Sequence, residues 1–221
     1  MITPERALDH PEAFILENTR LQSSPLVPEI QLHLADEMLP LWKLTEAELD
    51  ASGLPPPWWA FAWAGGQALA RHILDHPELV RGARVLDFAT GSGIVAIAAM
   101  KAGAMSARAN DIDPIAIAAT RLNAEANGVY VRVSADNLVG QPSHGWTAVL
   151  AGDICYEQPL AGEVETWLKS LAGEALVLMG DPGRTHLPQT GMTRIAEYRV
   201  ETTRELEDND VRHTTVWRFE P

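Results

Sequence analysis

The residues best placed to do chemistry lie in the stretch Val85–Gly93, where an apolar segment runs into an acid and two glycines. A parallel strand buried on both faces is a short apolar run, and Val85-Leu86 fits that pattern. Gly91 and Gly93 can adopt positive φ and let a ligand approach the backbone closely. Residues 94–100 predict a helix whose first N–H groups point back at the turn. The stretch therefore predicts a strand, a ligand-binding turn and a helix.

The spacing of the glycines does not identify the ligand by itself. Gly91, Gly93 and Ala96 form G-x-G-x-x-A, which also satisfies the fingerprint of dinucleotide-binding turns. The carboxylate of Asp87 would repel a pyrophosphate, but it suits a positively charged ligand such as the sulfonium of S-adenosylmethionine. We therefore predict a class I methyltransferase site. An NAD or FAD site, or a glycine turn that only packs a helix on a sheet, are the alternatives.

Five successive predicted strands each run into an aspartate, at Asp87, Asp111, Asp136, Asp153 and Asp181. After the first strand, the others are expected from residue 107 and over residues 130–134, 147–151 and 175–179. In open α/β sheets the ligand lies outside the carboxyl ends of the strands. A rim of carboxylates there favours a cationic ligand and a cationic substrate over phosphates.

The C-terminal part alternates like two antiparallel strands, at residues 195–203 and 213–219, separated by the polar turn 207–210. Together with the five strands before them they predict an α/β, Rossmann-like fold. Its sheet has seven strands, is mostly parallel, and ends in an antiparallel hairpin.

Three acids and an amide are candidates for contacts with a bound nucleoside. Asp111 lies twenty residues beyond Gly91, the distance at which a βαβ unit brings a carboxylate to the ribose hydroxyls. Asp113 precedes Pro114 and is expected to cap the next helix. Asp136 or Asn137 is expected to accept from the adenine amino group, or both residues form a turn.

Residues 54–67 hold three of the seven tryptophans within six positions. Trp58 and Phe61 are expected to anchor the N-terminal segment on the sheet. Trp63 stands at the start of a helix predicted over 66–74 and is expected to face the glycine turn as part of the cofactor site. Before it, residues 26–34 alternate like a half-buried strand, and residues 44–51 predict a short acidic helix ended by Gly53.

Composition narrows the class of protein. The 221 residues, 46% of them hydrophobic, are enough for one domain with a sizeable core, and we expect residues 1–63 to wrap a cofactor-binding core at 64–221. A net charge of −13 without a Lys/Arg cluster argues against nucleic acid. No apolar signal core or membrane span is apparent, so a cytoplasmic location is expected. The seven histidines and one cysteine show no paired metal-ligand spacing, and no metal is expected.

Five motifs along the chain resemble one family, the electron transfer flavoprotein β subunit lysine methyltransferases, which have the seven-strand fold. They are Pro28–Ile30, Trp59–Arg71, Leu86–Gly93, Ala109–Pro114 and Gly180–Arg184, and Asp153-Ile-Cys-Tyr156 matches the D-x-x-Y signature of such lysine methyltransferases. The D-x-D-P element is shared with ribosomal protein methyltransferases and is less specific than the tryptophan–glycine stretch and the G-D-P-G-R turn.

The resemblance implies S-adenosylmethionine as cofactor and lysines of the flavoprotein β subunit as substrate. Asp153 would orient the target amine and Tyr156 would wall the lysine channel, unless Asp153 caps the following helix and Tyr156 packs beneath it. Cys155 is expected to point into the core. A nicotinamide-type or ribosomal protein methyltransferase, a non-catalytic cofactor-binding module and an NAD-dependent oxidoreductase are the rival functions.

Overall fold

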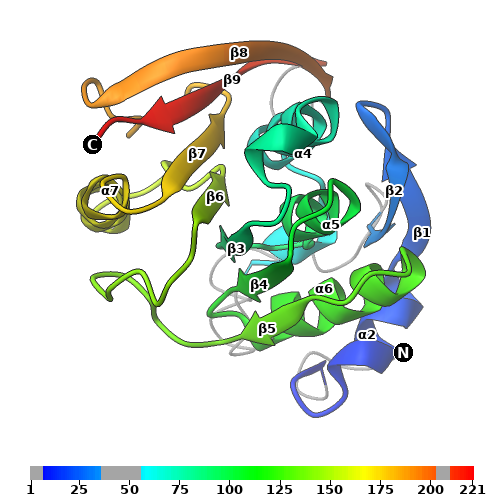
Figure 1. Ribbon diagram of the computed structural model, residues 1–221. Coiled ribbons are helices and arrows are strands. Elements are labelled where there is room, and N and C mark those ends of the chain that lie inside the picture. Colours follow the sequence, from blue (N-terminus) through cyan, green and yellow to red (C-terminus); the bar gives the residue numbers. More distant parts are fainter. Residues whose placement is uncertain (1–6, 36–55, 203–209) are drawn as a thin grey trace.

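A computed structural model describes residues 7–35, 56–202 and 210–221 (Figure 1). Its centre is a seven-stranded sheet of order β5-β4-β3-β6-β7-β9-β8, in which β9 runs antiparallel to both of its neighbours and the other neighbouring pairs are parallel. The strands are β3 (Arg84–Phe88), β4 (Ser106–Asn110), β5 (Arg132–Ser134), β6 (Ala148–Gly152), β7 (Leu176–Asp181), β8 (Met192–Glu201) and β9 (Val211–Phe219). The predicted Rossmann-like architecture is confirmed.

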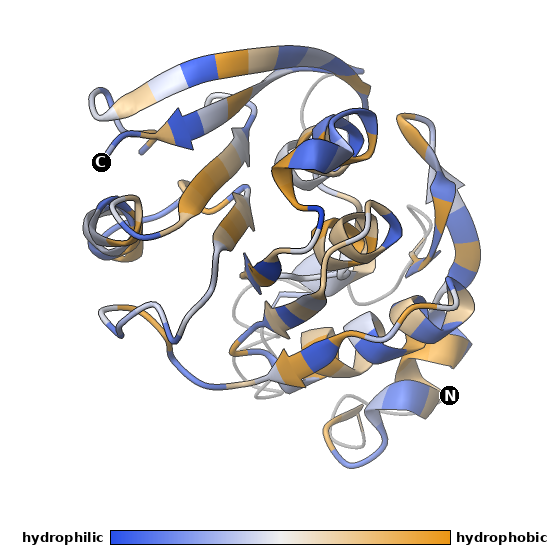
Figure 2. Ribbon diagram, viewed as in Figure 1, coloured by the Kyte–Doolittle hydropathy of each residue, from blue (hydrophilic) through white to orange (hydrophobic). Residues whose placement is uncertain are grey.

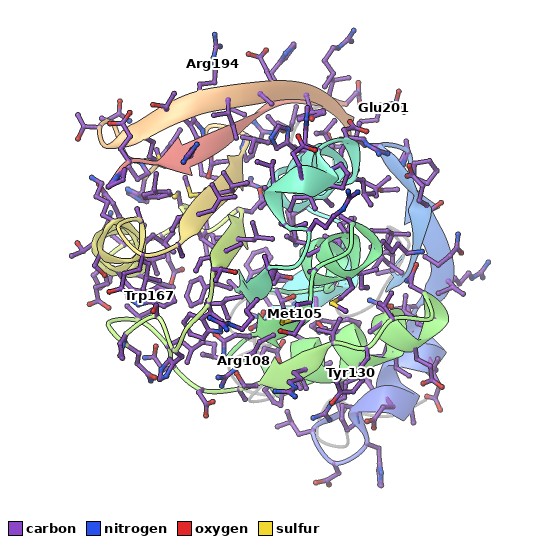
Figure 3. All side chains as sticks on the ribbon, viewed as in Figure 1. Met105, Arg108, Tyr130, Trp167, Arg194 and Glu201 are labelled. Atoms are coloured by element: carbon purple, nitrogen blue, oxygen red, sulfur yellow. The ribbon has the colours of Figure 1, made fainter. Side chains whose placement is uncertain are left out.

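The central strands are apolar because helices or loops cover both of their faces. β6 and β7 are buried along most of their length, and their hydrophobic character is plain in Figure 2. β5 is shorter than predicted, because this edge strand pairs with β4 only from Arg132 to Ser134. Tyr130, labelled in Figure 3, lies before it and is exposed.

Helices cover the two faces of the sheet unequally (Figure 1). α4 (Ala64–Asp75), α5 (Ile94–Lys101) and α6 (Pro114–Ala126) lie on one face, and α7 (Leu160–Leu171) lies on the other. α5 is buried nearly all round and contributes small side chains, such as Ala96, Ala98 and Ala99, to the largest core cluster. A short 3-10 helix, η3 (Pro77–Leu79), follows α4.

The N-terminal part packs outside the α4, α5 and α6 layer. It comprises α2 (Pro11–Asn18), a hairpin of β1 (Arg20–Ser24) and β2 (Val27–Leu34), and the 3-10 helix η2 (Trp58–Ala60). The predicted strand is confirmed, with Val27, Ile30, Leu32 and Leu34 buried against the core. The helix expected at 44–51 lies outside the described residues.

The C-terminal strands β8 and β9 form the predicted antiparallel pair, and β9 joins the sheet beside β7. Most of the expected turn at 207–210 lies outside the described residues. No helix within the described ranges is long and apolar enough to cross a bilayer.

Candidate active site

The turn after β3 has the backbone that the glycines predict. Gly91 and Gly93 have φ of 51° and 83°, and Ala89 has φ 53°, which is uncommon for a residue with a side chain. Such strained residues occur preferentially at functional sites. A Cβ on Gly93 would lie 2.9 Å from Cγ2 of Thr120, so this position needs a glycine for space as well as for conformation.

Asp87 lies beneath this turn instead of facing a ligand. Its side chain is buried, and Oδ2 accepts hydrogen bonds from the hydroxyl of Thr90 at 2.5 Å and from the N–H of Ala96 at 2.9 Å. Burial raises the pKa of Asp87 to about 7. The expectation that this carboxylate attracts a cationic ligand directly is therefore corrected. Asp87 ties the turn to the first turn of α5.

Asp111 does reach the glycine turn. Its Oδ2 accepts from the N–H of Gly91 at 2.9 Å, and its Oδ1 accepts from the N–H of Asp113 at 3.0 Å. Burial raises the pKa of Asp111. Asp113 caps α6 as predicted, because its carboxylate accepts from the N–H of Ile115 at 2.8 Å. Between the two acids the side chain of Ile112 is 72% exposed, an apolar surface at the site that the sequence reasoning missed.

Asp136 and Asn137 both have protein partners in the structure, and the expected contact with adenine stays a prediction. The carboxylate of Asp136 forms an exposed ion pair of 2.8 Å with Arg108, a β4 residue labelled in Figure 3. Oδ1 of Asn137 accepts from the N–H of Val139, which is the turn that was the alternative. The buried side chain of Asn110 holds the backbone of this segment, since its Nδ2 donates to the carbonyl oxygens of Ser134 and Asp136.

Asp153 follows β6 with φ 56° and is held on both carboxylate oxygens. Oδ2 accepts from the N–H of Gly66 in the first turn of α4 at 2.9 Å, where the helix dipole favours a negative charge. Oδ1 accepts from Nη2 of Arg184 at 2.6 Å and from Nε at 3.2 Å. The helix that Asp153 caps is therefore α4, and the alternative of a cap on α7 is wrong, since α7 begins without a side-chain cap.

Three glycines permit this approach of α4 to the strand ends. A Cβ on Gly65 would lie 2.3 Å from the carbonyl oxygen of Gly180 and 2.5 Å from Oδ2 of Asp153. A Cβ on Gly152 would lie 2.9 Å from the backbone of Gly66, and one on Gly180 would lie 2.1 Å from the carbonyl oxygen of Gly65. Any side chain at these positions would push the helix N-terminus away from Asp153.

The turn after β7 supplies Arg184, whose contact with Asp153 the sequence did not predict. Asp181 is buried, and its Oδ1 accepts from the N–H groups of Gly183 and Arg184 at 2.7 Å each. This fixes the backbone from which the guanidinium reaches Asp153. Cζ of Arg184 also lies 5.7 Å from the centroid of the Trp63 ring, within cation–π range.

Aromatic rings stand beside the Asp153 and Arg184 pair. Trp63 precedes α4, and its Nε1 donates to the carbonyl oxygen of Trp58 at 2.8 Å. The Trp58 ring centroid lies 5.3 Å from that of Trp63 and 5.8 Å from that of Tyr156. Tyr156 is 45% exposed, so it does not pack beneath α7, and burial of part of the ring raises its pKa.

The two adjacent tryptophans of η2 have opposite environments. Trp58 is 41% exposed, which corrects its expected role as an anchor. Trp59 is 1% exposed and packs edge-on against Phe14 of α2, so it is the anchor, together with the buried Phe61. The backbone of Trp58 and Trp59 lies 3.9 Å from a Cβ built on Gly91, so this segment borders the glycine turn.

The predicted aspartates do lie at the strand ends, but their carboxylates are paired with other groups of the protein. Asp87 and Asp181 accept from backbone N–H groups, and Asp136 and Asp153 have arginine partners. Cys155 points into the core as predicted, next to Met179, and burial raises the pKa of its thiol to about 12.

Comparison with known proteins agrees with this geometry. Residues 69–154 match the family model described as ribosomal protein L11 methyltransferase (PrmA). Among solved structures, magnesium protoporphyrin IX methyltransferase from Synechocystis PCC 6803 has a TM-score of 0.54 at 14% identity, covering 84% of this chain and 100% of that one. The ribosomal protein L11 methylase from Lactobacillus delbrueckii subsp. bulgaricus has a TM-score of 0.51 at 22% identity, covering 69% and 77%. These structures establish the fold.

Curated relatives are more similar in sequence. The chain is 39% identical over 229 residues to the electron transfer flavoprotein beta subunit lysine methyltransferase of Xenopus laevis, covering 100% of this chain and 92% of the relative. It is 40% identical over 218 residues to the human protein of the same name, covering 95% and 82%. The chain belongs to the electron transfer flavoprotein β subunit lysine methyltransferase family.

Proposed function

We propose that this protein is an S-adenosylmethionine-dependent lysine N-methyltransferase that acts on the β subunit of electron transfer flavoprotein. The observation that carries the proposal is the arrangement of Asp153. Its carboxylate is fixed between the α4 N-terminus and Arg184, beside the exposed rings of Trp58 and Tyr156 and near the turn that contains Gly91.

The residues around the glycine turn fit the cofactor. Gly91 and Gly93, both at positive φ, have no side chains to keep a ligand from the backbone of the turn, and Asp111 has carboxylate lone pairs beyond those used by the backbone. We assign the turn and Asp111 to the nucleoside, with the exposed Ile112 as an apolar surface for a base. Trp63 keeps its proposed place in the cofactor site, and Asp87 acts by holding the turn in shape. Bound S-adenosylmethionine supplies a methyl group on a positively charged sulfur.

The chain itself must position and desolvate the target amine. An amine attacks only with its lone pair available, so the lysine has to be neutral. A lone carboxylate would hold the amine as an ammonium ion, but Arg184 offsets the charge of Asp153. Asp153 can therefore orient the amine by a hydrogen bond without fixing its proton. Trp58 and Tyr156 form the walls that exclude water from the amine.

The domain organisation is also part of the proposal. We propose that residues 1–221 work as one methyltransferase domain, with 64–221 as the cofactor-binding core and 1–63 as a wrap. Support comes from the packing of α2 and η2 on α6, through the buried side chains of Ile15, Trp59 and Ile115 among others, and from the hydrogen bond that joins β2 to α6. A cytoplasmic location stays a prediction.

Transfer of a labelled methyl group tests the function. The enzyme is incubated with labelled S-adenosylmethionine and, in parallel, with purified flavoprotein, ribosomal protein L11 or nicotinamide. We expect label in lysines of the flavoprotein β subunit with the wild type, and incorporation about a hundredfold slower or less with Asp153→Asn. Label in ribosomal protein L11 or nicotinamide alone would replace the proposed substrate with one of these rivals. No label with any acceptor, despite cofactor binding, would support a non-catalytic module.

A further inference from the structure

A buried asparagine on α6 joins the glycine turn to the N-terminal hairpin. Asn123 is fully buried, and its Nδ2 donates to the carbonyl oxygen of Ser92, inside the turn, at 2.8 Å. Its Oδ1 accepts from the backbone N–H of His33 in β2 at 2.7 Å. One carboxamide therefore bridges β2 and the glycine turn, which lie far apart in the chain.

A second asparagine, one helical turn later, holds the hairpin without touching the glycine turn. Oδ1 of Asn127 accepts from the N–H of Gln31 at 3.0 Å, and its Nδ2 donates to the carbonyl oxygen of the same residue at 2.6 Å. Asn127 thus pairs with β2 as a neighbouring strand would. Asn127 is therefore a matched control for Asn123, because it binds the hairpin but not the glycine turn.

α6 also holds the turn at the residue before Ser92. The hydroxyl of Thr120 donates to the carbonyl oxygen of Gly91 at 3.2 Å. In a planar trans peptide the N–H points opposite to the C=O, so this bond directs the N–H of Ser92 away from α6. The peptide that follows is held at both ends, because the carbonyl oxygen of Ser92 binds Asn123 and the N–H of Gly93 donates to Thr90. Side chains of α6 therefore set the direction of the backbone groups in the turn.

We propose that Asn123 is a positioning residue for the cofactor, through which occupancy of the glycine turn and the stability of the β1–β2 hairpin are coupled. The proposal rests on the cofactor site assigned above, but not on the identity of the methylated substrate. Hydrogen bonds in a buried, low-dielectric setting are expensive to leave unmade, so ordering the Ser92 carbonyl also favours the bond to His33. Such coupling acts equally in both directions.

The test measures both directions with S-adenosylhomocysteine as the probe. Calorimetry gives its Kd for the wild type, Asn123→Ala and Asn127→Ala, and hydrogen exchange follows the amides of residues 27–34 with and without it. In the wild type we expect the probe to slow exchange at 27–34. In Asn123→Ala the Kd should rise about tenfold, which corresponds to about 1.4 kcal/mol, and the slowing should disappear. In Asn127→Ala the amides of residues 27–34 should exchange faster than in the wild type, with and without the probe. Its Kd for the probe should stay within about threefold of the wild type, and the probe should still slow exchange at 27–34.

Asn123→Asp is a second variant beside the alanine variant, because it keeps the size of the side chain and an acceptor for His33; as a carboxylate it loses the donor to Ser92 and adds a buried negative charge. It should show the same loss of affinity and of coupling. Equal Kd values for the Asn123 and Asn127 variants, or exchange at 27–34 that ignores the probe in the wild type, would overturn the proposal. A wild type that does not bind the probe would overturn the cofactor site and this coupling together. Absent methylation of the flavoprotein would overturn the proposed substrate alone.

Discussion

The guanidinium of Arg184 lies 2.6 Å from the carboxylate of Asp153, so the acid expected to orient the target amine already has a cationic partner. Both side chains are largely buried in this pair. Loss of one member of a buried ion pair strongly destabilises the folded protein, because the other charge is left without compensation. The pair therefore sets the charge as well as the position of Asp153, and a change to either residue should affect catalysis before it affects cofactor binding.

Asp153→Asn should lower kcat about a hundredfold or more, because removal of one preorganised polar contact to the reacting group has effects of that size. Binding of S-adenosylhomocysteine should stay within about threefold of the wild type. Glu165→Gln is the control, since Glu165 also forms an ion pair, with Lys169 on α7, and should turn over at the wild-type rate. Steady-state kinetics and calorimetry measure the two effects. An Asp153→Asn enzyme with more than half the wild-type kcat would remove Asp153 from the mechanism.

Substitution of the two adjacent tryptophans should separate activity from stability. Trp58→Ala should lower kcat/KM for the protein substrate about tenfold and leave the free energy of unfolding within about 1 kcal/mol, because the ring is substantially exposed. Trp59→Ala should reduce the free energy of unfolding by about 3 to 5 kcal/mol, because it empties a buried site. Urea unfolding and kinetics on both variants check this. The reverse pattern would show that Trp58 is the anchor after all.

Gly65→Ala should destabilise the protein by about 2 to 3 kcal/mol and move α4 away from Asp153, because the new methyl group would meet the carbonyl oxygen of Gly180 at 2.3 Å. Gly173→Ala is the matched control, since a Cβ there meets nothing within 4 Å, and it should change stability by less than about 0.5 kcal/mol. Thermal or urea unfolding compares the two variants. Equal stability of both would contradict the close approach of α4 to β7.

The acid beneath the glycine turn should make stability depend on pH. Burial raises the pKa of Asp87 to about 7, well above that of an aspartate in the unfolded chain, at about 4. Between these values the native state binds a proton that the unfolded chain has lost, so the free energy of unfolding should fall as pH rises from about 4 to about 7. Burial of Asp113, whose pKa is raised to about 6, acts in the same direction.

Asp87→Asn isolates the part due to this residue. The difference in free energy of unfolding between the wild type and Asp87→Asn should change with pH by up to about 4 kcal/mol across that window and be constant outside it. Urea unfolding of the cofactor-free proteins from pH 4 to pH 8 measures it. Parallel pH profiles for the two proteins would mean that Asp87 titrates normally in the folded state.

Asp136→Asn should have little effect on the cofactor. Its carboxylate pairs with Arg108 at an exposed position, where such pairs contribute at most about 1 kcal/mol. The Kd of S-adenosylhomocysteine should stay within about twofold of the wild type by calorimetry. A tenfold weaker Kd would instead support the adenine contact that the sequence predicts.

The sequence predicts the sheet well because each of its signals is local. Apolar runs mark β6 and β7, the alternation after residue 26 marks β2, and Pro114 marks the start of α6. The length of a strand is harder to predict, because it depends on where the strand pairs with its neighbour. The pairing of β5 with β4 begins only at Arg132, so Tyr130 lies before the strand despite its strand-forming side chain.

The site is only partly predictable, because spacing gives the position of a side chain but not its partner. Asp87 and Asp111 both stand at strand ends, yet one turns under α5 and the other faces the N–H of Gly91. The arginine partners of Asp136 and Asp153 come from another strand and from a distant turn. The glycine contacts between α4 and the strand ends are likewise visible only in three dimensions.

Mass spectrometry of the electron transfer flavoprotein β subunit, isolated from cells with and without this protein, tests the central claim most directly. We predict lysines that carry added methyl groups when the protein is present, unmodified lysines when it is absent, and restoration by the wild type but not by Asp153→Asn. A β subunit whose lysines are identical in all four samples would contradict the account.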